Sequence, residues 1–468
     1  MITEAVAQAV RRARTAQARI AGLPQSALDD MVAAVGWAGY REDEAQRIAR
    51  SSHAETGLGD PDALFGLQRH RVLGMLRDLH GVRTVGVIGE DPARGLVTLA
   101  KPLGVIAVAT PATAPGPGIL CNALPMLKTG NAMVFTPHPR ARRTTEETVR
   151  LIRSALAAVG APEDLVQCLE VSGKEATSAL MSAADHVVAI GGSGTVRRAY
   201  QSGTPAIGAG VGNPTVIVDE TADLADAAEK IMTGAGFNNG TSCSSESNVL
   251  VHASVAERFR ALCAEYGAHL CDADETAWVR KALWPDGTTL DRALVGRTAQ
   301  EIARAAGIDT DPCAPPAVLV LDCPDLHASD PLLTEKLSPV VTLGVYEDFA
   351  EAVETQAALL DRCGRGHSCG IHSSRPERVM AVAARVDTCR VVVNQSTMTN
   401  TGSFTSGVPF TTVLSCGSWG GTSVSGNLTW SHLLNCTTVS RPLPERRPDP
   451  RALFGRHWDP AHGGDAAA

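Results

Sequence analysis

The chain has 468 residues, 44% hydrophobic and 20% charged, which is the composition of a globular protein with room for two ordinary domains, or three if one is small. Its 42 Lys and Arg against 50 Asp and Glu give a formal charge of −8 with no block of basic residues, so we expect neither nucleic acid nor an anionic membrane as a partner. No apolar run reaches the roughly 18 residues that a membrane span requires.

The first 20 residues predict an amphipathic surface helix. Ile2, Val6 and Val10 recur at helical spacing among scattered arginines, and Glu4 does not fit a signal peptide. A transit peptide is the alternative interpretation of this segment. Without an export signal, we expect a cytoplasmic protein.

The pattern stays helical to about residue 80, with a break near residues 57–61, and short β-rich runs then alternate with helices. This alternation favours an α/β fold built on a parallel sheet. The predicted strands cover residues 85–88, 96–100, 105–109, 132–135, 166–171, 186–190, 247–251, 317–321 and 391–394. The predicted helices cover residues 119–128, 145–159, 174–183, 223–235, 253–267 and 349–360, with another beginning at 195. Thr144 and Glu147 have the spacing of a capping box at the start of the second of these helices.

The chain contains twelve cysteines, but its length and apolar content make a disulfide framework unnecessary. It has no CxxC motif and no paired Cys and His spacing of the zinc type, so no metal site is expected. Most of the thiols should be small buried hydrophobic groups. A catalytic cysteine therefore has to be argued against that background.

Glycines 191, 192 and 194 follow a predicted apolar strand and open a helix. Backbone amides at such a turn can meet a phosphate without side-chain obstruction. The segment is not a GxGxxG motif, because Arg197 stands where the last glycine would be. A nucleotide-binding turn and a turn without a ligand both remain open on these residues alone.

Cys243 lies in the polar segment Phe237-Asn-Asn-Gly-Thr-Ser-Cys-Ser-Ser-Glu246, between a helix and a strand. Hydroxyl groups and backbone amides, rather than apolar residues, flank its thiol. Such surroundings favour a thiolate, which is the form that attacks carbonyl carbons. Among the twelve cysteines it is the least typical of a core, and the alternative is an incidental loop cysteine.

This segment resembles the nucleophile region of the aldehyde dehydrogenase superfamily, most closely its acylating, coenzyme A-dependent branch. Further segments resemble that branch in the same order along residues 25–440, including the aldehyde half of bifunctional aldehyde/alcohol dehydrogenases and the sulfoacetaldehyde dehydrogenases. They are Lys101-Pro-Leu-Gly-Val-Ile106, Phe135-Thr-Pro-His-Pro-Arg-Ala141, Glu335-Lys-Leu-Ser-Pro339 and Cys416-Gly-Ser-Trp-Gly-Gly421 with His432-Leu-Leu-Asn435.

The resemblance implies an aldehyde dehydrogenase-like α/β fold with a Rossmann-like cofactor domain, an α/β catalytic domain and a small oligomerisation extension. We assign residues 1–236 to the first and 237–405 to the second. Residues 406–440 would form the return segment and oligomerisation region of a homodimer or homotetramer. Residues 441–468, rich in Pro, Arg, Asp and Gly, predict an exposed, partly disordered tail.

In the chemistry that the resemblance implies, Cys243 attacks a small aldehyde, hydride leaves to a nicotinamide, and coenzyme A takes the acyl group from the cysteine thioester. The reverse reaction would reduce an acyl-CoA. Hydrolytic relatives carry a glutamate that activates water, whereas the corresponding segment here, Ile207-Gly-Ala-Gly-Val-Gly-Asn213, has no carboxylate. This absence favours acylation over release of the free acid.

The resemblance also implies cofactor contacts. Glu335 would hold the nicotinamide ribose, although without the motif it would be taken for a solvated carboxylate at a helix edge. Gly192, Ser193 and Gly194 would lie beneath the pyrophosphate, with Thr136 and His138 near the adenosine ribose. Relatives that prefer NAD often place a glutamate where this chain has Pro139 followed by Arg140. NADP is therefore slightly favoured over NAD.

The chain departs from the family where an asparagine usually polarises the substrate carbonyl, because Ala114 stands there. The Cys243 backbone amide and Thr113 could suffice, a ligand group could compensate, or the enzyme could be slow or altered. His367 resembles a histidine near the catalytic centre that could move a proton to or from the thiol, and a structural histidine is the alternative. The remaining alternatives are a hydrolytic enzyme and a catalytically impaired nucleotide-binding homologue.

Overall fold

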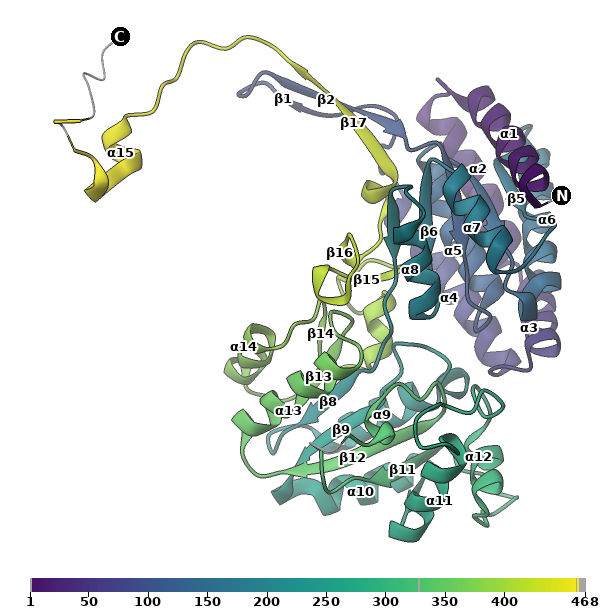
Figure 1. The fold of residues 1–468 in the computed structure, drawn as a ribbon, viewed down its shortest axis with the longest axis vertical. Coiled ribbons are helices and arrows are strands. Elements are labelled where there is room, and N and C mark those ends of the chain that lie inside the picture. Colours follow the sequence, from purple (N-terminus) through teal and green to yellow (C-terminus); the bar gives the residue numbers. More distant parts are fainter. Residues whose placement is uncertain (1, 327–328, 460, 463–468) are drawn as a thin grey trace.

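The computed structural model describes residues 2–326, 329–459 and 461–462. Figure 1 shows two lobes stacked along the long axis, each built around a sheet, and an arm that projects from the upper lobe. None of the helices within those ranges combines the length and the apolar character that crossing a bilayer requires.

Four helices form the N-terminal part of the upper lobe. They are α1 (Ile2–Ile20), α2 (Gln25–Tyr40), α3 (Glu42–Thr56) and α4 (Pro61–Leu79). Helix α1 buries Val6 and Val10 in the core that it shares with the first sheet, which confirms the predicted amphipathic helix. Asp60 caps α4, because its side chain accepts a hydrogen bond from the Ala63 N–H at 2.7 Å.

The sheet of the upper lobe has five parallel strands in the order β5-β4-β3-β6-β7. Its strands are β3 (Val105–Ala109), β4 (Ala132–Thr136), β5 (Val166–Cys168), β6 (His186–Ala189) and β7 (Ala206–Gly208), and its helices are α5 (Pro115–Lys128), α6 (Arg142–Ala158), α7 (Lys174–Ala183) and α8 (Ser193–Gln201). The chain runs outward from β3 in one direction through β4 and in the other through β6. At such a switch point, open α/β sheets bind ligands beyond the carboxyl ends of their strands.

The lower lobe contains a parallel sheet of seven strands in the order β10-β11-β12-β9-β8-β13-β14. The strands are β8 (Thr215–Val218), β9 (Asn248–His252), β10 (Ala268–Cys271), β11 (Val318–Asp322), β12 (Val340–Tyr346), β13 (Cys369–His372) and β14 (Val391–Val393). One core contains α9 (Leu224–Gly236) and α10 (Ala256–Glu265), and another contains α13 (Phe349–Arg362) and α14 (Pro376–Arg385). Helices α11 (Ala273–Leu283) and α12 (Ala299–Ala306) form a smaller core with β10 and β11.

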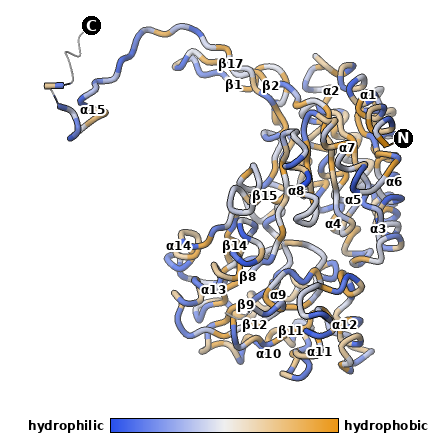
Figure 2. Tube along the Cα trace, in the orientation of Figure 1, coloured by the Kyte–Doolittle hydropathy of each residue, from blue (hydrophilic) through white to orange (hydrophobic). Residues whose placement is uncertain are grey.

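The projecting arm is an antiparallel sheet of three strands, β1 (Gly86–Asp91), β2 (Leu96–Pro102) and β17 (Leu434–Ser440), with β2 in the centre. A short hairpin of β15 (Leu414–Cys416) and β16 (Ser425–Asn427) precedes it. Beyond β17 an exposed segment leads away from the body to α15 (Pro450–Phe454), and Figure 2 shows this segment as largely hydrophilic. The exposure agrees with the predicted tail, part of which lies outside the described residues.

Short 3-10 helices complete the secondary structure. They cover Pro139–Ala141, Glu163–Leu165, Phe237–Gly240, Ala253–Val255, Pro331–Leu333, Thr397–Thr401, Ser418–Gly420, Trp430–Leu433 and Gly455–His457. All twelve cysteines are free thiols, and half of them are buried.

Two sequence predictions differ from this architecture. The capping box of Thr144 and Glu147 is wrong: α6 begins at Arg142, and the Thr144 hydroxyl and N–H instead donate to Glu55 at 2.7 Å. The predicted domain boundary after residue 236 also differs from the sheets, because β8 and α9 belong to the lower lobe. The chain changes sheet between β7 and β8, some 20 residues earlier than predicted.

Candidate active site

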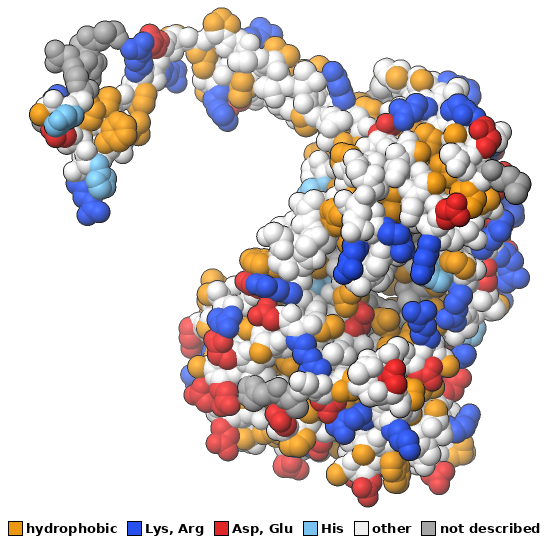
Figure 3. Space-filling view, in the orientation of Figure 1, with side chains coloured by type: hydrophobic (Ala, Val, Ile, Leu, Met, Phe, Trp, Pro, Cys, Tyr) orange, Lys and Arg blue, Asp and Glu red, His pale blue; other side chains and the backbone are white. Residues whose placement is uncertain are grey.

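A cavity lies where loops of the two sheets meet. Arg71 from α4, Ala114 before α5, Gly192 before α8, Cys243 after α9 and Glu335 before β12 all line it. Pro111, Ile190 and Ala209, in the loops after β3, β6 and β7, line it too, so it opens at the carboxyl edge of the first sheet. Figure 3 shows the surface hollowed between the two lobes, with Lys and Arg side chains gathered beside the hollow.

The loop that carries Cys243 is fixed by hydrogen bonds rather than by regular structure. Asn238 and Asn239 adopt left-handed conformations with φ of 50° and 53°, which asparagine tolerates better than most residues. The Asn238 side chain accepts from the Asp60 N–H at 2.8 Å and donates to the Thr241 hydroxyl at 2.6 Å. Gly212 packs against this loop so closely that a Cβ there would lie 1.9 Å from the Cys243 carbonyl oxygen. The position of the thiol is therefore set by its neighbours.

His367 lies beside Cys243 and is fully buried. Its Nε2 is 3.3 Å from the Cys243 Sγ, and its Nδ1 is 2.8 Å from the Ser368 hydroxyl. Asn400 donates to that hydroxyl at 2.7 Å and accepts from the Ser244 hydroxyl at 2.8 Å. The imidazole is thus oriented by a chain of hydrogen bonds that returns to the residue next to the thiol.

Burial leaves both members of this pair uncharged at rest. It raises the pKa of Cys243 to about 12, helped by the negative charge of Glu335, against the opposing charges of Arg71 and Arg390. Burial also lowers the pKa of His367 to about 3, with the Arg390 charge adding to the effect. The prediction that the loop favours a thiolate is therefore wrong for the resting protein. The sequence showed the polar neighbours of Cys243 but not the depth of the cavity.

The cavity offers hydrogen-bond donors near the thiol without the family asparagine. Ala114 contributes only a methyl group to the wall. Among the described residues, the Cys243 N–H and the Thr113 hydroxyl have no hydrogen-bond partner, and both residues line the cavity. These two groups are the available donors for an oxygen bound to the carbon that Cys243 attacks.

Glu335 is a half-buried cavity residue and not a solvated residue at a helix edge. Its Oε1 accepts from the Gly212 N–H at 3.3 Å, and burial raises its pKa to about 7. It is the one carboxylate that lines the cavity within the described part of the chain. The segment Ile207–Asn213 supplies the wall through Ala209, Gly210 and Val211, which cannot act as bases.

The other predicted cofactor residues lie along the same edge of the first sheet. Gly192 lines the cavity, and Ser193 and Gly194 form the exposed first turn of α8, where their N–H groups are free within the described residues. Thr136 ends β4 and is buried, with its hydroxyl 2.9 Å from that of Thr177. His138 follows it, and its Nδ1 accepts from the Arg140 N–H at 3.2 Å. The open helix terminus fits a dinucleotide phosphate.

Three residues of the site were missed by the sequence reasoning. Ser368 and Asn400 orient His367, and Arg71 brings a positive charge to the cavity. Ser368 sits next to the predicted histidine, which is a weak signal. Asn400 and Arg71 come from distant segments and had no sequence signal.

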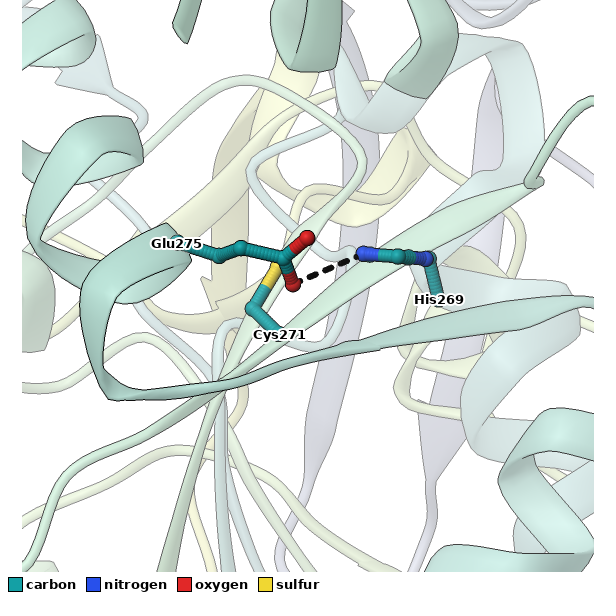
Figure 4. Close-up of side chains that lie close together, drawn as sticks. All are labelled: His269, Cys271 and Glu275. Carbon is teal, nitrogen blue, oxygen red and sulfur yellow. Dashed lines mark hydrogen bonds and ion pairs between the residues drawn. The ribbon is translucent and has the colours of Figure 1, made fainter. Parts of the chain in front are cut away.

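A second cluster of potential ligand atoms lies on β10 and α11, outside the cavity. The potential metal-ligand atoms of His269, Cys271 and Glu275 lie within 4.8 Å of one another. Figure 4 shows His269 and Glu275 pointing toward each other. Glu275 accepts from His269 at 2.9 Å and completes a capping box with Asp272. Burial raises the pKa of Cys271 to about 12, so its thiol stays protonated. Hydrogen bonding and helix capping account for this cluster.

Comparisons with known proteins agree on one family. A family profile described as the aldehyde dehydrogenase family matches residues 2–277. A Cupriavidus necator protein named sulfoacetaldehyde dehydrogenase (acylating) is 39% identical over 97% of this chain and 92% of its own length. An acetylating aldehyde dehydrogenase from Geobacillus thermoglucosidasius superposes with a TM-score of 0.91 at 31% identity, covering 96% of this chain and 98% of that one. A propionaldehyde dehydrogenase from Rhodopseudomonas palustris, solved with bound CoA and an acylated cysteine, gives a TM-score of 0.83 at 25% identity, covering 93% and 97% of the two chains.

Proposed function

This chain belongs to the aldehyde dehydrogenase family and is a CoA-acylating enzyme, and we propose that Cys243 is its nucleophile, with His367 as the general base. It interconverts an aldehyde and an acyl-CoA with NAD(P). The observation that carries the residue assignment is the 3.3 Å contact between the Sγ of Cys243, which lines the cavity, and the Nε2 of the buried His367. A nucleophile within hydrogen-bond reach of an oriented base is the arrangement that thiol attack requires.

In the first step, Cys243 attacks the aldehyde carbon while its proton passes to the His367 Nε2. Donation of the Nδ1 proton to Ser368 leaves Nε2 with a free lone pair for this purpose. The oxygen of the resulting thiohemiacetal gains negative charge, which the Cys243 N–H and the Thr113 hydroxyl stabilise. Because the thiol and the imidazole are both neutral at rest, this proton transfer creates the thiolate only when substrate is present.

NAD(P), when bound, accepts the hydride that leaves the thiohemiacetal carbon, and a thioester on Cys243 remains. Glu335 would hold the nicotinamide ribose, the first turn of α8 with Gly192, Ser193 and Gly194 would bind the pyrophosphate, and Thr136 and His138 would lie near the adenosine ribose. The support is their placement along one edge of the sheet, with free N–H groups at the helix terminus. The preference for NADP over NAD rests on Pro139 and Arg140, where no carboxylate opposes a 2′-phosphate.

In the second step, after His367 has released the first proton to solvent, the thiol of coenzyme A attacks the thioester carbon and gives its proton to His367, which passes it to the leaving Cys243 thiolate. Water is a much weaker nucleophile than a thiol, so its attack on the same carbon would require a further carboxylate base placed to activate it. The wall segment Ile207–Asn213 has no carboxylate, and we assign Glu335 to the cofactor rather than to water. The thiol acceptor is therefore favoured over water.

Dependence on coenzyme A tests the function directly. With an aldehyde and NAD(P), we expect absorbance at 340 nm to rise continuously only when coenzyme A is present, and acyl-CoA to accumulate in equal amount. Without it, the signal should stop at about one equivalent per active site, because the thioester is not released. Equal turnover without coenzyme A would identify a hydrolytic enzyme. No change in absorbance at 340 nm in either direction of the reaction would identify a nucleotide-binding homologue without catalytic activity.

Restoring the family amide should change the rate. Since the loss of one oxyanion donor typically lowers kcat by about 10²–10³-fold, we expect Ala114→Asn to raise kcat on a simple aldehyde by at least about tenfold. Steady-state kinetics on both proteins measure this, with Ala112→Asn in the same loop as the control. No gain would mean that the Cys243 N–H and Thr113 already supply the stabilisation.

We further propose that the enzyme is a homodimer or homotetramer assembled through the arm. Strands β1 and β17 are the edges of its sheet, β17 is exposed over most of its length, and Val439 and Leu443 expose 42% and 44% of their surface. Unpaired edges with apolar side chains favour addition of a second copy.

The relative from Cupriavidus necator is named for sulfoacetaldehyde, an aldehyde that carries an acid group. We propose that the substrate of this chain is likewise a short aldehyde with an anionic group.

A further inference from the structure

Arg71 is a charged residue in the active-site cavity without a partner. It lies on α4 and lines the cavity that contains Cys243. Within the described part of the chain, no hydrogen bond or ion pair involves its guanidinium group, and its Nε is buried without an acceptor. Arginine stays protonated at neutral pH, and a partly buried charge without a counter-ion is unfavourable compared with the same charge in water.

The contrast with Arg390 shows that this site does not lack acceptors in general. All three nitrogens of the Arg390 guanidinium are used, by the His367 carbonyl at 3.0 Å, the Asn427 side chain at 2.9 Å and the Ser415 carbonyl at 2.8 Å. Arg390 therefore supports the structure around His367. Arg71 has no such structural use, so its donors remain available to a ligand.

Among residues 2–326, 329–459 and 461–462, no carboxylate forms an ion pair with Arg71. Its charge acts on the thiols of Cys121 and Cys243, whose pKa values burial raises to about 12, so neither is an anion at rest. The carboxylate of Glu335 is influenced by burial and by the Gly212 N–H, not by Arg71. Arg71 and Glu335 line the cavity from separate elements, helix α4 and the segment before β12.

We propose that Arg71 forms an anion subsite that binds the acid group of the aldehyde substrate while Cys243 attacks its carbonyl carbon. The inference rests on the proposed function and adds the residue that selects the substrate. A sulfonate and a carboxylate share the required chemistry, because either presents two oxygens to the two parallel N–H donors of a guanidinium. A neutral aldehyde leaves the half-buried charge of Arg71 unpaired, and the site discriminates against it for that reason.

Selectivity between anionic and neutral aldehydes tests the subsite. We would measure kcat/KM with coenzyme A for sulfoacetaldehyde, succinic semialdehyde and propanal on the wild type, R71M, R71K and the control R69M. The control removes an arginine of the same helix that packs over the Tyr40 ring and does not line the cavity. We expect the wild type to prefer an anionic aldehyde, and R71M to lower the ratio of anionic to neutral kcat/KM by at least about 10²-fold. R71K should lose less, and R69M should keep the wild-type ratio.

Comparing sulfoacetaldehyde with succinic semialdehyde shows which acid group the subsite prefers. The preferred group belongs to the substrate with the higher kcat/KM relative to propanal. A wild-type ratio at or below one for both, or an R71M ratio within about threefold of the wild type, would overturn the subsite. If no aldehyde is turned over, the proposed function fails and the subsite is still tested by calorimetry with sulfoacetate and succinate. Binding to the wild type that is lost in R71M supports it, whereas no binding to the wild type or equal binding to both contradicts it.

Discussion

Replacing Cys243 by alanine should lower turnover with any aldehyde by at least about 10⁴-fold, because the reaction then has no atom to carry the acyl group. Affinity for NAD(P) should change little, since the cofactor contacts proposed here involve other residues. The measurement is single-turnover formation of NAD(P)H, together with mass spectrometry of protein incubated with aldehyde and oxidised cofactor. The wild type should gain one acyl group on Cys243, and the variant should gain none.

Cys389→Ala is the matched control for this experiment. Cys389 is also half-buried, but its Sγ contacts the Ser425 hydroxyl at 3.3 Å outside the cavity. We expect the control to keep both the rate and the adduct. Residual activity of Cys243→Ala above a few per cent of the wild type would disprove the nucleophile assignment.

Replacing His367 by alanine should lower kcat/KM at pH 7 by about 10²–10⁴-fold, because the Cys243 proton then has no acceptor. The pH profile at saturating cofactor is the decisive readout. His367 has a lowered pKa of about 3, so its base form is present throughout pH 5–9 and contributes no limb to the wild-type profile. In the variant, attack depends on the thiolate of a group with a pKa of about 12, so the rate should rise about tenfold per pH unit across that range.

His372→Gln provides the control for removal of a buried histidine. His372 lies on β13, and burial lowers its pKa to about 4, but unlike His367 it has no hydrogen bond to Cys243. We expect the His372→Gln variant to have the same pH profile as the wild type. A flat profile in His367→Ala, parallel to the wild type, would show that His367 only supports the structure.

Much of the architecture could be predicted from the sequence, because most helices and strands have a recognisable local pattern of apolar and polar residues. The strand over residues 105–109 and the helix over 174–183 match β3 and α7 residue for residue. Strands β8, β12 and β13 were missed: β8 and β13 have only four residues each, and Gly344 interrupts the apolar run of β12. The boundary between the lobes was misplaced for the same reason, because an unrecognised β8 left α9 with the first sheet.

The candidate site was only partly predictable, and the missing part depends on burial and on long-range contacts. Cys243, Glu335 and His367 stand in recognisable motifs, and the structure brings all three close together. The protonation of Cys243 could not be predicted, since polar neighbours in sequence do not reveal how deeply a loop is buried. Arg71 could not be found either, because 172 positions separate it from the thiol and one arginine among several on a helix is not distinctive.

The uncharged pair of Cys243 and His367 also has a consequence for chemical damage. Peroxides oxidise thiolates far faster than thiols, and the first product, a sulfenic acid, can proceed to irreversible forms. A cysteine that faces a cavity yet keeps its proton until an aldehyde arrives is protected from such oxidation between turnovers. The sulfur therefore resists oxidation while the enzyme is at rest and becomes sensitive to it only during each catalytic cycle.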